Sequence, residues 1–377
     1  MIYQYIHSTG IGVFSMGATK SKRIFYFDAL RALAIISVII FHVFNVTRGM
    51  ASVAFLNQPS IQWVFATTTG NYFCIGVDLF LMLSGALSLG RDWDIRTFLG
   101  KRIPRIVGPF LFWGFVLSIV MVCASFVIPN MNVLNHLDLM SYLNYLGNCY
   151  MARNMGFTPY WFFWMILGTY LIMPIFNKWL LHCDMKEVEY FLVIWIISSI
   201  FLYTLVDVTF PIKLSYFTSP IGMVVLGYYL RHTDRRILNN PYFAIFLMAM
   251  SFIACYAVST ALSTPDAIYR PERYDIFHIM TVTGVFMLFK NFSKLAPGVH
   301  LSDGSLFKKS AFSIAKYSYG IYLIHRVVLL FVHYFMRAQP GYIVLDIELI
   351  LMTLILSWAI MAILNRVPYV NQVIGAK

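Results

Sequence analysis

The chain has 377 residues, of which 60% are apolar and 12% charged, and its mean hydropathy is +0.73. This composition excludes an ordinary soluble globular protein. It indicates a polytopic membrane protein that is embedded in the lipid bilayer, its expected partner. The formal net charge is +12, but the basic residues are spread over short loops between apolar segments. That pattern is typical of membrane topology signals and gives no indication of a nucleic-acid partner.

Ten apolar segments are long enough to cross about 30 Å of hydrocarbon, so we predict an all-α fold with about ten transmembrane helices. In chain order these segments cover 25–47, 72–90, 106–129, 160–177, 188–208, 216–230, 241–262, 275–290, 313–336 and 343–365. No loop between them is long enough for a separate soluble domain. We therefore predict an N-terminal cytoplasmic segment over 1–22, a single transmembrane domain over 23–366 and a short C-terminal tail over 367–377.

The distribution of Lys and Arg predicts the orientation of these helices. With the N-terminus inside, most of the 28 Lys and Arg residues fall in cytoplasmic segments, as the positive-inside rule requires. We therefore expect both termini in the cytoplasm. The external segments receive Arg48, Arg153, Lys213, Arg270, Arg273 and Arg337, while Arg31 and Arg326 lie inside predicted helices.

The first predicted helix carries three ionisable residues, Asp28, Arg31 and His42, in the apolar run FDALRALAIISVIIFHV. Arg31 and His42 lie within about 20° of each other on one helix face and about 16 Å apart along the axis. An ionisable group in mid-bilayer costs about 2.5–3.5 kcal/mol, so we expect this face to line one hollow that connects the inner leaflet with His42. In a purely structural alternative, Asp28 and Arg31 form an ion pair near the interface and His42 packs in the core.

Four further motifs follow in the chain. They are GVDLFLMLSG at 76–85, KRIPRIVGPF at 101–110, YWFFWMILGTYLIMP at 160–174 and KYSYGIYLIHR at 316–326. Together with the polar face of the first helix, these motifs resemble the acyltransferase 3 family of integral membrane acyltransferases, the type that O-acetylates O-antigens and other surface polysaccharides. Arg326 departs from the family pattern, in which an apolar residue follows the histidine.

The resemblance implies an acyl-CoA-dependent O-acyltransferase, with acetyl-CoA as the expected cytoplasmic co-substrate. The acceptor is then a hydroxyl group of a cell-envelope glycan or of a lipid-linked saccharide, and the transmembrane domain over 23–366 is an acyltransferase domain. The expected location is the bacterial cytoplasmic membrane.

Acyl transfer to a hydroxyl group requires a base that takes up the hydroxyl proton, and histidine as a residue type titrates close to neutral pH. We predict that His42 is this base, acting either directly or through an acyl-histidine. Counting residues from the outer helix ends places Asp78 at a similar depth, so Asp78 is a candidate to orient His42. Alternatively, Asp78 only contacts a neighbouring helix or faces the outer cavity. His325 is a candidate to stabilise the thioester oxygen or to hold the acceptor.

The phosphates of the donor favour arginine, which binds them with two parallel hydrogen bonds. Arg102 and Arg105 are the candidates, with Arg31 slightly deeper; from composition alone, Arg102 and Arg105 are ordinary positive-inside residues. Ser84 either contacts the donor or, with its small neighbours, lets helices pack closely. Trp161 either stacks on the acceptor sugar or belongs to the aromatic belt at the outer boundary.

We predict no metal site, because neither the cysteines nor the remaining histidines have the spacing of metal ligands. The cysteines are Cys74, Cys123, Cys149, Cys183 and Cys255. Two other functions stay open. One is a transporter or flippase that moves a glycan or an anion through the same polar cavity, and the other is a sensor or structural subunit descended from such an enzyme.

Overall fold

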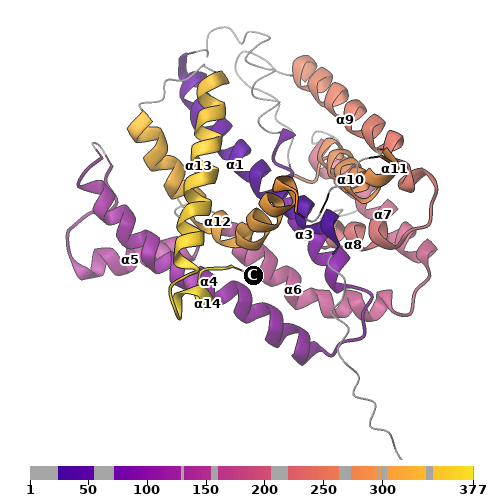
Figure 1. Cartoon of the computed structure of the whole chain (residues 1–377), viewed down its shortest axis with the longest axis horizontal. Coiled ribbons are helices and arrows are strands. Elements are labelled where there is room, and N and C mark those ends of the chain that lie inside the picture. Colours follow the sequence, from indigo (N-terminus) through magenta and orange to yellow (C-terminus); the bar gives the residue numbers. More distant parts are fainter. Residues whose placement is uncertain are drawn as a thin grey trace, which may run out of the picture.

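The computed structural model describes residues 24–54, 72–128, 131–153, 160–204, 220–262, 273–295, 297–298, 302, 304–336 and 343–376, with the backbone alone described at 48–54 and 343–345. All regular secondary structure in these ranges is helical (Figure 1). This confirms the all-α prediction. The predicted N-terminal segment over 1–22 lies outside the described residues.

A helix lies at each of the ten predicted segments. These helices are α1 (Phe25–Ala54), α3 (Gly76–Ser88), α4 (Ile95–Ser125), α6 (Trp161–Leu180), α7 (Met185–Ser199) with the π-helical turn η1 (Ile200–Thr204), α8 (Pro220–His232), α9 (Pro241–Leu262), α10 (Ile276–Lys290), α12 (Leu306–Met336) and α13 (Ile343–Leu364). Further elements are α5 (Leu139–Tyr150), the 3-10 turn η3 (Ile237–Asn239), α11 (Phe292–Leu295) and α14 (Val370–Val373).

Five of the described helices, α1, α4, α9, α12 and α13, are long and apolar enough to cross a membrane. Their outward faces carry large exposed apolar side chains, for example Phe246 and Ile253 on α9 and Leu351 and Ile355 on α13. Exposed apolar faces of this extent are unfavourable in water, and a lipid environment explains them. The structure therefore supports a multi-pass helical membrane protein, while ten crossings and cytoplasmic termini remain predictions.

Helix α4 begins at Ile95, well before the segment predicted from residue 106. The reason is a cap: the Asp94 carboxylate accepts hydrogen bonds from two backbone N–H groups in the first turn, which stabilises a helix start. The Arg-x-x-Arg motif is consequently helical. Arg102 and Arg105 are three residues apart and project from neighbouring positions on one face.

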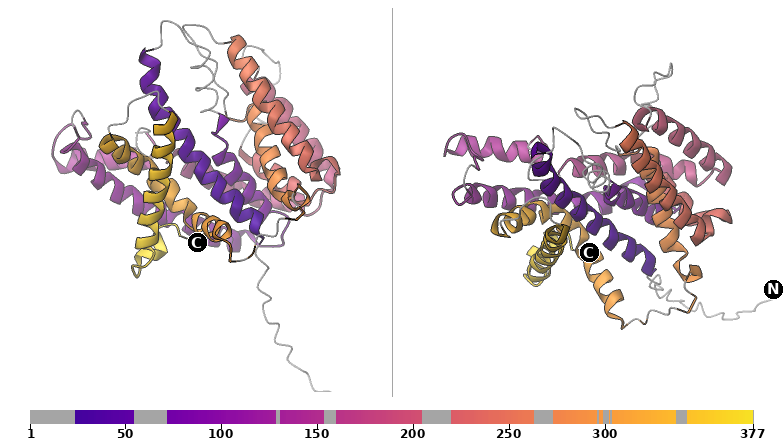
Figure 2. Two further views of the ribbon diagram at one scale, coloured as in Figure 1. Left: turned by 45° about the horizontal axis from the view of Figure 1, so that its top comes forward. Right: turned by 90° about the horizontal axis from the view of Figure 1, so that it is seen from above.

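Helix α1 lies at the centre of the bundle, in contact with α3, α10, α12 and α13 (Figures 1 and 2). Glycines bring α3 very close to two neighbours. A Cβ atom at Gly76 would collide with the Ala34 carbonyl of α1, and one at Gly85 would collide with the backbone of Val224 in α8. Gly85 therefore has the packing role predicted for the small residues beside Ser84.

The chain after α13 returns to the bundle. Nε1 of Trp113 in α4 donates to the backbone carbonyl of Ile374 at 3.1 Å, and Ile374 is fully buried. Gly375 has a φ of +84° and lies against Tyr319 and Gly320 of α12. The end of the segment predicted as a short C-terminal tail, at Ile374 and Gly375, is thus packed against α4 and α12, while Tyr369 is exposed.

Candidate active site

One cavity at the surface of the bundle is rich in basic side chains, and we term it the basic cavity. It has a volume of about 380 Å³ and is lined by Arg31 of α1, Arg102 and Arg105 of α4 and Lys316 of α12. Among the described residues that line it, none is acidic. Three helices thus bring four cations to one hollow, which favours an anionic ligand.

Polar contacts hold these side chains in place. Nη2 of Arg102 donates to Oγ of Ser88 at 2.7 Å, and Nη1 of Arg31 lies 3.6 Å from Oδ1 of Asp28. The Asp28 carboxylate is buried, so these two residues form a close intrahelical pair. Ser84 also lines the basic cavity, but its hydroxyl donates to the backbone carbonyl one turn earlier at 2.9 Å. Only the lone pairs of its oxygen are left for a ligand.

A second cavity, of about 310 Å³, contains His42, and we term it the histidine cavity. Cys74, Trp161, Arg273 and Tyr322 also line it. Tyr322 lines the basic cavity as well. The sequence predicted one hollow along the polar face of α1, whereas the described residues form two cavities along this helix, with Tyr322 in the lining of both.

A second histidine lies behind His42. The ring centroids of His42 and His325 are 5.1 Å apart, with 38° between the ring planes. Nδ1 of His325 lies 2.7 Å from the carbonyl oxygen of Tyr322 and 3.2 Å from that of Ile321. Two carbonyl oxygens can only accept, so we assign the ring proton of His325 to Nδ1. Its Nε2 has a lone pair and is buried without a hydrogen-bond partner in the part of the chain that the structure describes.

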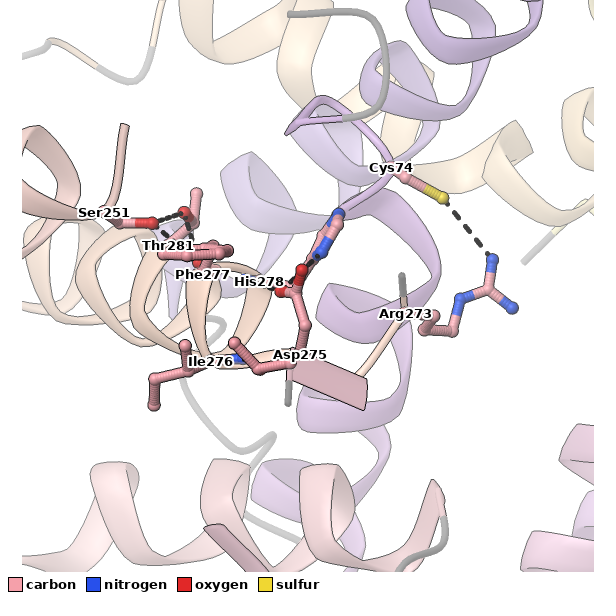
Figure 3. A network of polar contacts seen from close by, with 9 residues as sticks. Cys74, Ser251, Arg273, Asp275, Ile276, Phe277, His278 and Thr281 are labelled. Atoms are coloured by element: carbon pink, nitrogen blue, oxygen red, sulfur yellow. Dashed lines mark hydrogen bonds and ion pairs between the residues drawn. The ribbon is translucent and has the colours of Figure 1, made fainter. Parts of the chain in front are cut away.

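Arg273 also lines the histidine cavity, although the distribution of basic residues predicted it to lie in an external segment. The guanidinium of Arg273 lies over the Trp161 ring, 4.2 Å from its centroid. Nη2 of Arg273 donates to Sγ of Cys74 at 3.5 Å (Figure 3). The next residue, Tyr274, has a φ of 70°, and this local reversal lets the arginine reach away from Asp275 toward Cys74. An arginine in an external loop is ordinary, so no sequence pattern marked it.

A buried acidic group, Asp78, lies near this arginine but outside ion-pair distance. Asp78 has no exposed surface, and neither of its carboxylate oxygens has a hydrogen-bond partner among the residues described. Its charged neighbours are Arg273, His278 and Asp275. Asp275 caps α10, because its Oδ1 accepts from the backbone N–H of His278 at 2.7 Å and lies 3.0 Å from Nδ1 of the same residue (Figure 3).

The structure does not bring Asp78 to His42. No hydrogen bond joins Asp78 to another described residue, and the described lining of the histidine cavity does not include Asp78. Residue counting fixes the height of a side chain along its helix but not the direction in which it points. The alternative, a hydrogen bond between Asp78 and a neighbouring helix, is also absent among the described residues, so the role of Asp78 stays a prediction.

Comparisons with known proteins identify a family. The family model described as an acyltransferase domain, of the acyltransferase 3 type, matches residues 24–362. No curated protein and no solved structure gives a significant match to the chain. The family match spans the helices that form both cavities and confirms the resemblance to the acyltransferase 3 family, while the polysaccharide-modifying type stays a prediction.

Proposed function

The chain belongs to the acyltransferase 3 family and is thus a membrane acyltransferase; from this premise we propose that it transfers an acetyl group from cytoplasmic acetyl-CoA to a hydroxyl group of a cell-envelope glycan or lipid-linked saccharide. The observation that carries the proposal is the pair of cavities along α1. One is lined by four cations, the other contains His42, and Tyr322 lines both. A donor with an anionic end and a reactive end fits this arrangement. The bacterial cytoplasmic membrane is the proposed location.

In this proposal the basic cavity binds the phosphates of CoA. Arg102 and Arg105 offer planar pairs of N–H donors, which suit phosphate oxygens. Arg31 lies deeper along α1, and its position about 16 Å from His42 leaves room for the extended pantetheine arm. The arm passes Tyr322, with the Ser84 oxygen available to accept a hydrogen bond from one of its amide N–H groups. The thioester then reaches the histidine cavity.

His42 is the proposed general base. It takes the proton of the acceptor hydroxyl as that oxygen adds to the thioester carbon. The tetrahedral intermediate collapses, the C–S bond breaks, and the CoA thiolate takes the proton from His42. His325 is a positioning residue in this scheme: its Nε2 lone pair has no partner among the described residues, and we propose that it accepts a hydrogen bond from one N–H of the His42 ring when the substrates are bound. The other His42 nitrogen is then free to act on the acceptor.

The acceptor occupies the histidine cavity beside Trp161. One face of the Trp161 indole is covered by the guanidinium of Arg273, so a sugar ring stacks only on the opposite face or edge. This restricts the sugar-binding role that the sequence indicated for Trp161. A saccharide held there places one hydroxyl group within reach of His42.

The test is the release of free CoA by the purified protein. The protein is reconstituted in liposomes with acetyl-CoA and with glycan or lipid-linked saccharide extracted from bacterial envelopes, and free thiol is measured together with the mass of the acceptor. We expect thiol release that depends on the acceptor, and an acceptor that gains one acetyl group. A protein that binds or moves saccharide without consuming acetyl-CoA would contradict the proposal and favour a transporter.

His42→Gln should abolish this release, with His182→Gln as the matched control. His182 is an exposed histidine after α6 and takes no part in either cavity as described. Both variants should insert and elute like the wild type. Wild-type turnover by His42→Gln would remove His42 as the base.

A further inference from the structure

The guanidinium of Arg273 is a buried positive charge that none of the roles above explains. Its close contacts are the Trp161 ring and Sγ of Cys74, and neither is ordinarily anionic. Over the described ranges, no carboxylate lies within ion-pair distance of it, and Asp78 acts on it from farther away. Asp78 therefore offsets the charge through space, and no carboxylate of the described residues takes up the hydrogen-bond donors of the guanidinium. Such an arrangement is useful where a negative charge develops during function.

The proposed reaction creates a negative charge in the same cavity. Arg273 and His42 both line the histidine cavity. When the acceptor oxygen adds to the thioester carbon, the electron pair of the C=O bond moves onto the carbonyl oxygen. That oxygen stays anionic until the C=O bond re-forms and the C–S bond breaks, releasing the CoA thiolate, which takes the proton held by His42.

We propose that Arg273 stabilises this oxyanion by hydrogen bonding, as a catalytic residue; the inference rests on the proposed acyl transfer. Nε of Arg273 is buried without a hydrogen-bond partner among the described residues, so at least one N–H donor is unused. The Trp161 ring and Cys74 hold the plane of the guanidinium before substrate binds. A donor that is already oriented needs no reorganisation at the moment of reaction.

His325 was the residue that the sequence indicated for this task. It is not among the described residues that line the histidine cavity. Its Nδ1 lies 2.7 Å from the Tyr322 carbonyl, and a neutral imidazole has only one N–H. The proton of His325 is therefore engaged, whereas the guanidinium of Arg273 has five N–H donors.

The experiment compares Arg273→Gln and Arg273→Lys with the matched control Arg153→Gln. Arg153 is an exposed arginine after α5. The kcat and the KM values for acetyl-CoA and for the acceptor are measured in liposomes. We expect the kcat of Arg273→Gln to fall about 100- to 1,000-fold, with both KM values within about threefold of the wild type. Arg273→Lys keeps the charge but loses the planar fork, so its kcat should fall about tenfold.

Two results would overturn the inference. One is a kcat of Arg273→Gln within about threefold of the wild type. The other is a raised acceptor KM with kcat retained, which would show that the charge binds an anionic group of the acceptor. If Arg273→Gln does not elute as folded protein, an unchanged kcat in Arg273→Lys overturns the inference. A wild-type protein that releases no CoA would instead contradict the proposed function itself, so the two failures are distinguishable.

Discussion

Arg102→Ala should weaken donor binding without slowing the chemical step. Arg102 lines the basic cavity and is held by Ser88 at 2.7 Å, so its guanidinium is oriented before the donor arrives. A hydrogen bond to a charged group contributes about 1.5–3 kcal/mol. Because Arg102 is half-buried, we expect its removal to weaken donor binding by about 2 kcal/mol, within this range. That loss corresponds to about a 30-fold rise in the donor KM.

Arg105→Ala should have a smaller effect. Arg105 also lines the basic cavity, but it is exposed, and water and salt screen exposed ion pairs. We expect a loss of about 0.5–1 kcal/mol, or a two- to fivefold rise in the donor KM.

The assay compares two donors. Acetyl-CoA carries the nucleotide phosphates, and S-acetylpantetheine lacks them. The KM of each variant should rise for acetyl-CoA and stay near the wild-type value for S-acetylpantetheine, with kcat unchanged. Arg96→Ala is the control, because Arg96 is an exposed residue of the same helix that is absent from the described lining of the basic cavity. An equal loss with both donors, or an equal effect in Arg96→Ala, would refute phosphate binding by Arg102.

Three further predictions concern the scaffold. Gly85→Leu should lower the unfolding midpoint, because a Cβ atom there would collide with α8 and overpacking costs about 1–3 kcal/mol; Gly168→Leu, where nothing lies within 4 Å, should leave it unchanged. Trp113→Phe removes the hydrogen bond to Ile374, so thermal unfolding should show a loss of about 1 kcal/mol, and wild-type stability would mean that this contact does not fix the C-terminal segment. Tyr322→Ala opens the wall between the cavities and should raise CoA release measured without acceptor; release at the wild-type level would show that this side chain does not keep water from the thioester.

The helices were predictable because lipid imposes a simple rule on sequence. A segment that crosses a membrane must be apolar over its whole length, so runs of apolar residues locate α9 and α13 closely. Helix α5 was missed, because it lies between the predicted spans 106–129 and 160–177, where no apolar run is long enough to cross a membrane. Its carboxylate cap at Asp138 was the available signal.

The relative placement of site residues was predictable where the residues belong to one helix. Arg31 and His42 share α1, so helical geometry alone places them on one face. Whether Asp78 and His42 point toward each other depends on the rotation of each helix about its own axis. Residue counting gives the depth of a side chain but not this rotation. Arg273 was missed for a similar reason, since a loop before α10 returns to the cavity only through the local turn at Tyr274.

The aromatic wall between the cavities has an electrical consequence. The ring centroids of Tyr322 and Phe162 are 4.8 Å apart; Phe162 lines the basic cavity, and Tyr322 lines both cavities. An enzyme that draws its two substrates from opposite sides of an energised membrane risks becoming a leak for protons and other ions. In the proposed reaction these tilted rings would separate the two cavities electrically: a neutral acetyl group on its arm would pass beside them, while a hydrated ion would be held back.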